Sequence, residues 1–318
     1  MEKQSADTST RAAFVITSHA DIPLLRRLVD RLLAGSPDVR VYISHDIAGE
    51  PGVEDLVGPR CTVIREVGGR GDFTQIERIV SLFRLVEADG GADYVTVLSG
   101  MDYPARPISD FLDALTSAGD GYLHNFPALD PQGSDWAMHE ARQRYLYRWW
   151  ILWPLSASSR RRWHWLHGVN YVQPFLRVNI SYGTFRLAWL RGRLPNGMTV
   201  HGGSAWFTIS RRAVRHVLAT VDSRPDILRW ARTSLAVDEV FFQSILLSAG
   251  TFDFINSNAR YIDFESDGFG HPKVLTEEDL ERIDASDAYF IRKVDRARSA
   301  TLLDKLDERV TGREADDR

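Results

Sequence analysis

The sequence predicts a single α/β domain with a mostly parallel central sheet flanked by helices. Short apolar, β-branched runs alternate with segments whose leucines recur at helical spacing, the pattern of right-handed βαβ units. The 318 residues are 44% hydrophobic and 26% charged, which is ordinary globular composition with ample chain for a buried core. No repeat, low-complexity stretch or linker divides the chain. We therefore expect one domain over residues 12–305, between a disordered tail at 1–11 and a charged tail at 306–318.

The first half of the chain predicts the parallel part of the sheet. One helix is expected to begin after Asp21, which is a favoured N-cap, and Pro23 suits its first turn. A second, amphipathic helix is expected at 74–88. The expected strands cover 12–16, 39–43, 61–64 and 94–98.

The second half contains an insert before regular structure resumes. The insert, at about 136–170, holds six of the nine tryptophans and six arginines against one glutamate. Beyond it we expect a strand at 201–210, a helix at 211–219, a helix after 239, a strand at 258–264, a short helix at 279–287 and a last helix from 302.

The Trp/Arg-rich insert has three interpretations. Its aromatic faces suit a platform for a carbohydrate acceptor. Tryptophan and arginine also favour membrane interfaces, so the insert is a candidate for peripheral membrane contact. The third interpretation, which we favour at this point, is a buried helical hairpin whose arginine stems cover apolar surface.

Charge and cysteine content exclude several classes of protein. The formal net charge of -4 argues against bulk nucleic-acid binding. The single cysteine, Cys61, rules out an internal disulfide and a Cys-rich zinc site. The polar N-terminus lacks the apolar core of a signal peptide, and no run of about 18 apolar residues predicts a membrane span. We expect a soluble, cytoplasmic protein, and 35 Arg against 4 Lys is typical of a GC-rich bacterial coding sequence.

Three predicted strands end in polar residues. These endings are Thr17-Ser18-His19, Ser44-His45-Asp46 and residues 99–103. A ligand of an open parallel sheet lies beyond the carboxyl ends of its strands, and a nucleotide would use an acceptor such as Asp46 for its ribose. The alternative is that these residues only cap the helices that follow.

Common phosphate and metal motifs are missing. The chain has no P-loop, no D-x-D triplet, no H-E-x-x-H pattern and no G-x-S-x-G elbow, so a divalent cation has no evident site. Phosphates bound without a metal need cationic side chains, and Arg292-Lys293 offers a planar fork beside a point charge. The alternative for this pair is ordinary surface charge.

Asp238-Glu239 opens an otherwise apolar helix. Carboxylates at a helix start are favoured by capping and by the helix dipole, which is sufficient to explain the pair. The functional interpretation is a general base held on a rigid element, which typically contributes about 10²–10⁴-fold to rate.

The order of six motifs resembles the core-2/I-branching glycosyltransferases, glycosyltransferase family 14, over about residues 12–305. This resemblance implies a GT-A type fold, a UDP-sugar donor, inversion at the anomeric carbon and no metal. The motifs are Phe14-Val-Ile-Thr-Ser-His19, Val41-Tyr-Ile-Ser-His-Asp46, Leu98-Ser-Gly-Met-Asp-Tyr-Pro104, Gly203-Ser-Ala-Trp-Phe207, Val237-Asp-Glu-Val-Phe-Phe242 and Phe290-Ile-Arg-Lys-Val-Asp295.

The resemblance assigns expected roles to individual residues. Glu239 would deprotonate the acceptor hydroxyl, and Arg292 and Lys293 would neutralise the departing UDP. The candidates for nucleotide binding are Thr17, His19 and Asp46, to which the strand-end position adds Ser18. The candidates for sugar or acceptor binding are Asp102, Tyr103, Ser204, Trp206 and Asp238.

The expected activity is transfer of a sugar, N-acetylglucosamine above all, to a hydroxyl of a glycan, glycolipid or metabolite. This would make the chain similar to β-1,6-N-acetylglucosaminyltransferases. It lacks the membrane anchor and disulfides of the animal enzymes, which predicts a bacterial cytoplasmic member, with any membrane contact peripheral and through the insert. No cofactor, metal or nucleic-acid partner is expected. The alternatives are a xylosyltransferase, another UDP-sugar transferase, or a sugar-binding protein without turnover.

Overall fold

The computed structural model describes residues 10–69, 73–180, 183–264 and 272–316, so positions 1–9 of the expected tail lie outside it. Its centre is a six-stranded sheet in the order β3-β2-β1-β4-β12-β6. The first four of these strands are parallel, and β12 runs antiparallel to its two neighbours. The predicted α/β fold is therefore confirmed. The strands are β1 (Ala12–Ser18), β2 (Arg40–Asp46), β3 (Cys61–Glu66), β4 (Tyr94–Ser99), β12 (Thr208–Ser210) and β6 (Gly121–Tyr122).

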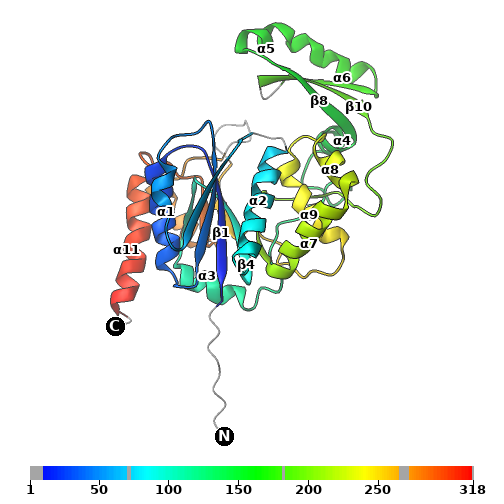
Figure 1. Cartoon of the computed structure of the whole chain (residues 1–318). Helices are drawn as coiled ribbons and strands as arrows, with labels where there is room; N and C mark the ends of the chain where they lie inside the picture. Colours follow the sequence, from blue (N-terminus) through cyan, green and yellow to red (C-terminus); the bar gives the residue numbers. More distant parts are fainter. Residues whose placement is uncertain (1–9, 70–72, 181–182, 265–271, 317–318) are drawn as a thin grey trace.

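Helices cover both faces of this sheet (Figure 1). Strand β1 shows why, because Ala13 and Val15 pack into one core cluster while Phe14 and Ile16 pack into the other. The first cluster is completed by α2 (Thr74–Ala88), α7 (Arg211–Ser223), α8 (Pro225–Ala231) and α9 (Phe241–Ser248). The second is completed by α1 (Ile22–Ala34), η1 (Val53–Leu56), α3 (Ile108–Leu115) and α11 (Ala300–Asp316).

The predicted start of α1 is confirmed in detail. Asp21 is the N-cap, and its Oδ1 accepts a hydrogen bond from the Leu24 backbone N–H at 3.2 Å, while Pro23 stands in the first turn. The predicted helix at 74–88 is also confirmed, because α2 has these bounds.

A second, three-stranded sheet brings the end of the chain beside β4. It is formed by β5 (Asp102–Pro104), β14 (Phe290–Arg292) and β13 (Arg260–Ile262), with Arg292 opposite Asp102. The expected strand at 258–264 is thus shorter than predicted, and the expected helix at 279–287 is η5 (Glu277–Asp279) followed by α10 (Leu280–Asp284).

The predicted strand at 201–210 is wrong as one element. It forms two short strands, β11 (His201–Gly202) and β12, and β11 pairs with β7 (Phe126–Pro127). Between them the backbone N–H of Gly203 donates to the carbonyl of Glu239 at 2.9 Å. A Cβ at Gly203 would lie 1.9 Å from the His124 carbonyl oxygen. This close backbone packing, which a strand pattern does not reveal, diverts the chain.

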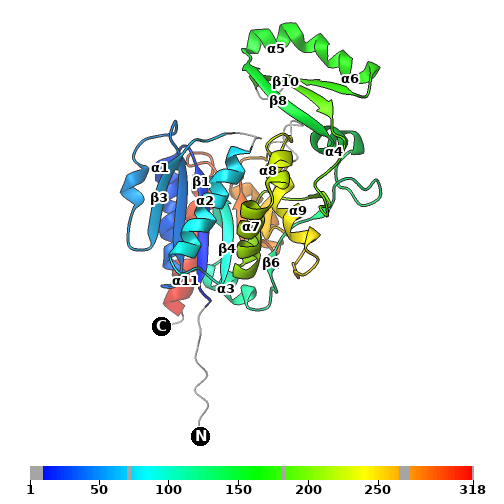
Figure 2. The same cartoon turned by 45° about the vertical axis from the view of Figure 1, so that its right-hand side comes forward.

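The Trp/Arg-rich region forms a lobe, residues 147–190, that projects from the main domain (Figures 1 and 2). The prediction of a buried helical hairpin is wrong, because β8 pairs with β10 and both Trp150 and Trp153 are over 40% exposed. Helix α4 (Met138–Tyr145) leads into the lobe. The lobe consists of β8 (Tyr147–Pro154), α5 (Ala157–Trp163), η2 (His164–Gly168), α6 (Val169–Val172), β9 (Leu176–Asn179) and β10 (Thr184–Leu190).

Candidate active site

The carboxyl ends of the parallel strands bring the predicted site residues to one edge of the sheet. Thr17 at the end of β1 stands opposite Ser44 of β2 on one side and Ser99 of β4 on the other. Asp46 ends β2, and Asp102 follows β4 at the start of β5. The strand-end residues therefore form one continuous polar rim.

Ser18 belongs to a buried hydrogen-bond network below this rim. Its Oγ lies 2.9 Å from Nδ1 of His45, and Nε2 of His45 lies 2.9 Å from the Glu50 carbonyl oxygen. Because a carbonyl only accepts, Nε2 carries the proton and Nδ1 accepts from the Ser18 hydroxyl. Burial lowers the pKa of His45, which favours this neutral ring. The Ser18 hydroxyl thus has a partner inside the protein, although we predicted it as a nucleotide contact.

Asp46 is held ionised at the end of β2. Its Oδ1 accepts backbone hydrogen bonds from Ala48 at 3.0 Å and Gly68 at 3.1 Å, and the first of these is the main cause that lowers its pKa. A Cβ on Gly68 would lie 2.1 Å from Oδ2, so glycine permits this close approach. The neighbouring His19 side chain is exposed. An ionised carboxylate beside an exposed ring suits the binding of a ribose and a base.

Thr17, within the rim, and Arg78, on the neighbouring helix α2, are both buried. The Thr17 hydroxyl accepts from Nε2 of Gln75 at 2.9 Å. Arg78, only 5% exposed, donates to the Ser44 hydroxyl and to the Ser18 carbonyl, both at 2.9 Å. Sequence analysis missed Arg78. The sequence feature that indicates its burial is its position, one helical turn before Leu82 on the apolar face of the helix at 74–88.

Arg292 reaches the rim from β14. Its guanidinium contacts the Ser99 hydroxyl and lies 3.3 Å from Oδ1 of Asp102, while the other oxygen of Asp102 accepts from the Ser99 backbone N–H at 2.5 Å. The same guanidinium lies over the Trp206 ring, 4.5 Å from its centroid. Three contacts therefore fix the orientation of Arg292.

Lys293 follows Arg292 and is half-buried. Among the described residues its ammonium group has neither a hydrogen bond nor an ion pair, whereas Lys273 pairs with Asp279 at 2.6 Å. Positions 292 and 293 thus carry one oriented cation and one cation that has no carboxylate partner in the described part of the chain.

Glu239 ends the 3-10 helix η4 (Val237–Glu239), directly before α9. Its backbone carbonyl holds Gly203, and Nε2 of Gln243 donates to the Ser204 carbonyl at 2.6 Å. The Ser204 hydroxyl in turn accepts from the Trp206 backbone N–H at 3.2 Å. We call residues 203–206 the bridging turn, because it is bonded to Glu239 at one end and carries the tryptophan under Arg292 at the other.

The Glu239 carboxyl group has an unusual pKa. Burial raises the pKa to about 7, repulsion from Asp238 adds to the rise, and Arg144 opposes it. Nη1 of Arg144 lies 3.3 Å from Oε2, and the side chain of Glu239 is still 40% exposed. A carboxyl group that is partly desolvated yet accessible, with a pKa near neutrality, suits proton abstraction. Sequence analysis missed Arg144, which no local pattern distinguishes from the other arginines of the insert.

Two predicted sugar- or acceptor-binding residues have other contacts in the structure. Tyr103 is fully buried, and its hydroxyl donates to Oδ1 of Asp307 on α11 at 2.6 Å. Asp102 is also fully buried and holds Arg292 and Ser99. Both side chains support the site from within the protein, because β5 buries them on both faces.

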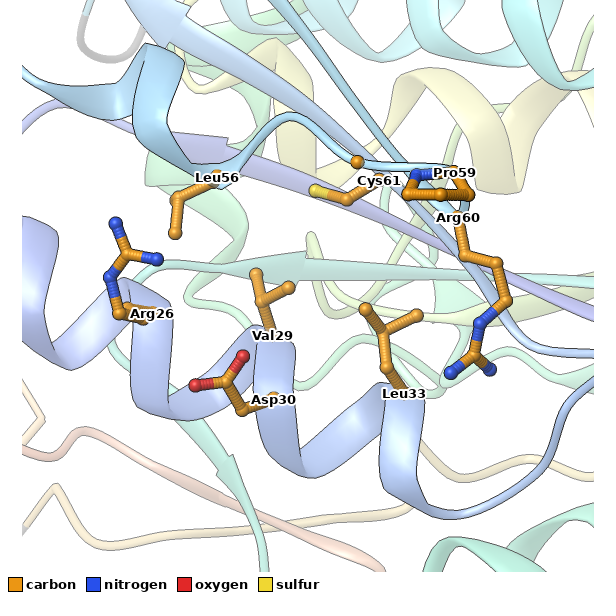
Figure 3. Close-up of a pocket in the computed structure, with 9 residues that line it drawn as sticks. Arg26, Val29, Asp30, Leu33, Leu56, Pro59, Arg60 and Cys61 are labelled. Carbon is orange, nitrogen blue, oxygen red and sulfur yellow. The ribbon is translucent and has the colours of Figure 1, made fainter.

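A separate hollow of about 350 Å³ lies far from this rim, between α1 and the start of β3 (Figure 3). Cys61 from β3 faces Val29 and Leu33 from α1 across it, and burial raises the pKa of the thiol to about 11. None of the predicted site residues lines it. The hollow is at the amino end of β3, away from the edge at which the polar side chains converge.

Metal ligands and membrane spans can be assessed over the described ranges. There, no three His, Cys, Asp or Glu side chains come together in an arrangement that would hold a metal ion. No helix in those ranges is both long and apolar enough to cross a bilayer.

The parallel-dominated central sheet with helices on both faces has the architecture of the GT-A type fold that the sequence predicted. Residues 77–285 match the family model "Core-2/I-Branching enzyme", about two thirds of the chain. The chain therefore belongs to the core-2/I-branching enzyme family, as its motifs predicted.

Two curated proteins of Arabidopsis thaliana are similar to this chain. Beta-glucuronosyltransferase GlcAT14B is 30% identical over 279 residues, which cover 86% of this chain and 57% of that protein. Beta-glucuronosyltransferase GlcAT14A is 28% identical over 145 residues, which cover 45% of this chain and 32% of that protein. The matches thus span between a third and somewhat over half of the length of these relatives.

Proposed function

We propose that this protein is an inverting, metal-independent glycosyltransferase that moves a sugar from a UDP-sugar to an acceptor hydroxyl, with Glu239 as general base. The observation that carries the proposal is the accessible Glu239 carboxyl with a pKa near 7. The bridging turn is bonded to the Glu239 backbone at one end and carries Trp206, over which Arg292 lies, at the other.

The reaction is a single displacement. The acceptor oxygen forms a bond to C1 of the sugar while its proton passes to a carboxylate oxygen of Glu239. The bond between C1 and the diphosphate oxygen breaks, and its electron pair leaves with UDP. Arg292 and Lys293 offset the growing negative charge, which is the role that a divalent cation has in metal-dependent transferases. Attack from the side opposite the leaving group inverts C1.

The nucleotide would occupy the rim over β1 and β2. Asp46 is ionised and accepts hydrogen bonds, so it suits the ribose hydroxyls. The exposed His19 and the rim near Thr17 would contact the uracil ring.

The donor sugar is the finer part of the proposal. N-acetylglucosamine is the donor that the motif resemblance favours, and glucuronic acid is a second candidate because both relatives are named beta-glucuronosyltransferases. A panel of UDP-N-acetylglucosamine, UDP-glucuronic acid and UDP-xylose, tested for hydrolysis and for transfer to glycan, glycolipid and small-molecule acceptors, separates these donors. Turnover with none of them would favour the sugar-binding protein without activity.

Glu239→Gln tests the base. We expect transfer to fall by at least about 10²-fold, with UDP affinity in calorimetry nearly unchanged, because the amide cannot accept the proton. Near-normal turnover of the variant would remove Glu239 from this role.

Arg292→Ala and Lys293→Ala test the diphosphate site. We expect UDP binding to weaken by about tenfold or more in each, because a charge-assisted hydrogen bond contributes roughly 1.5–3 kcal/mol. Lys305→Ala, an exposed lysine on α11, is the matched control. Wild-type binding should survive EDTA, and loss of binding on chelation would contradict metal independence.

A further inference from the structure

The lobe, residues 147–190, is a strongly basic part of a chain with a slight net negative charge. It contains six arginines and neither Asp nor Glu, and no acidic residue occurs between Glu140 and Asp222. Four of these arginines are exposed, and they are Arg148, Arg160, Arg161 and Arg162. Arginines 160–162 all lie on α5.

The lobe also concentrates the exposed apolar side chains of the protein. Ten of the fifteen large apolar residues that are exposed in the described chain lie within these 44 positions. Exposure is greatest on η2 and α6, where Trp165 is 73%, Tyr171 89% and Val172 81% exposed. The others are Trp150, Ile151, Leu152, Trp153, Phe175, Trp189 and Leu190. A surface of this kind marks an interaction site.

These side chains have little core of their own to pack into. The lobe's buried cluster consists of Tyr147, Trp149 and Ala188 with Leu235 of the main domain, at its base. Further out, Trp153 stacks on Phe185 with ring centroids 4.7 Å apart, and the pair remains near the surface. The outer aromatic and aliphatic residues therefore need a partner outside the protein to be shielded from water.

We propose that the lobe binds the surface of an anionic lipid bilayer. Exposed arginines suit phospholipid headgroups, and Trp and Tyr rings suit the boundary between headgroups and acyl chains. The aliphatic Ile151, Leu152 and Val172 suit the same boundary, whereas they offer no stacking face to the bases of a nucleic acid. A second copy of the lobe would bring like charges together. The proposal concerns a surface distinct from the transfer site and does not depend on the donor.

The position of the lobe agrees with a docking role. It projects from the end of the molecule at which β1 finishes, the same end as the polar rim, and α5 and α6 face away from the main domain (Figures 1 and 2). Arg191 holds its base by donating to carbonyl oxygens of Trp230 at 3.0 Å and Thr233 at 2.6 Å. Binding through α5 and α6 would therefore leave the rim on the membrane-facing end.

The test is co-sedimentation of the full chain with vesicles of equal phosphatidylglycerol and phosphatidylcholine, against phosphatidylcholine alone. We expect binding to the anionic vesicles that weakens with salt. The charge variant is Arg160→Gln with Arg161→Gln and Arg162→Gln, and the apolar variant is Trp165→Ser with Tyr171→Ser and Val172→Ser. Each should weaken binding by about tenfold or more. All six side chains are exposed, so circular dichroism should show that both variants keep the fold.

The control removes three exposed arginines of the main domain: Arg84→Gln, Arg215→Gln and Arg309→Gln. It changes the net charge equally and should bind vesicles like the wild type. The proposal would be overturned if this control lost as much vesicle binding as the lobe variants, or if both lobe variants bound vesicles like the wild type. It would also be overturned if the wild type did not bind vesicles. Two further results would overturn it if the wild type did not bind vesicles. One is self-association that is lost in the lobe variants, and the other is binding of a single-stranded oligonucleotide that is lost in them.

Discussion

Glu239 shows how one carboxyl group is prepared for proton transfer by its surroundings. Desolvation and the neighbouring Asp238 disfavour the charged form, and Arg144 limits their effect, so the pKa settles at about 7. The side chain nevertheless stays accessible. The opposing contributions of Asp238 and Arg144 make the pKa adjustable by single substitutions.

The pH dependence of transfer should report this pKa. Because the base must be ionised, kcat/KM should rise through a pKa of about 7 as pH increases. Arg144→Met removes a positive charge that stabilises the carboxylate, so the acidic limb of the profile should move to higher pH. The control is Arg142→Met, an exposed arginine of the same helix. A limb that stays in place in Arg144→Met would contradict the coupling.

The same group should affect stability in a pH-dependent way. Its pKa is raised on folding, so the folded state binds the proton more tightly than the unfolded state, and stability is lost as pH rises from the ordinary value of 4.5 to about 7. Glu239→Gln resembles the protonated form. We therefore expect it to raise Tm more at pH 8 than at pH 5, measured by thermal unfolding, and an equal change at both values would count against the raised pKa.

At the scale of elements, the bridging turn is the part of the site that long-range contacts create. Residues 203–206 are held to α9 and to Glu239 by Gln243 and by the Gly203 backbone. They place Trp206 beneath Arg292, which comes from the other end of the chain. The turn therefore couples the position of the base to that of the diphosphate site.

Gly203→Ala should disturb this coupling. The added Cβ would lie 1.9 Å from the His124 carbonyl oxygen, a backbone atom, so the turn must move. We expect a loss of about 1–3 kcal/mol in the free energy of unfolding and a reduced kcat. Gly58→Ala, where a Cβ meets nothing within 4 Å, is the matched control for chemical denaturation and activity. Normal stability and turnover in Gly203→Ala would show that the turn tolerates displacement.

At the scale of the whole molecule, the C-terminal helix closes the fold over the start of the chain. Arg27 of α1 pairs with Asp304 and Asp307 of α11, both at 2.7 Å. The Tyr103 hydroxyl, on β5, donates to the same Asp307. Three segments that are far apart in sequence are thus joined through Asp307.

Tyr103→Phe distinguishes this packing role from the predicted role in sugar binding. We expect a loss of about 1.5–3 kcal/mol in unfolding free energy, because the hydrogen bond goes to a charged acceptor, while the KM for donor and acceptor stays unchanged. Tyr94→Phe removes a hydrogen bond to the neutral Gly119 carbonyl and should cost less. A raised KM without destabilisation would restore Tyr103 to the site.

Local patterns in the sequence determined the parallel strands, the two helices α1 and α2 and the Asp21 cap, because hydrophobic period and capping chemistry act over a few residues. They also drew attention to Glu239, Arg292 and Lys293, and the order of motifs identified the family.

Only the tertiary structure decided how these residues are surrounded. Contacts between residues 95 positions apart place Arg144 beside Glu239, and contacts 34 positions apart bury Arg78 beside Ser44. The two-strand form of 201–210 depends on pairing with β7 and β4. The exposed lobe likewise replaced the expected hairpin because β8 pairs with β10 across 29 or more intervening residues. Periodicity records which side chains are apolar, whereas burial, pairing and the pKa of a carboxyl group arise from neighbours that only folding brings together.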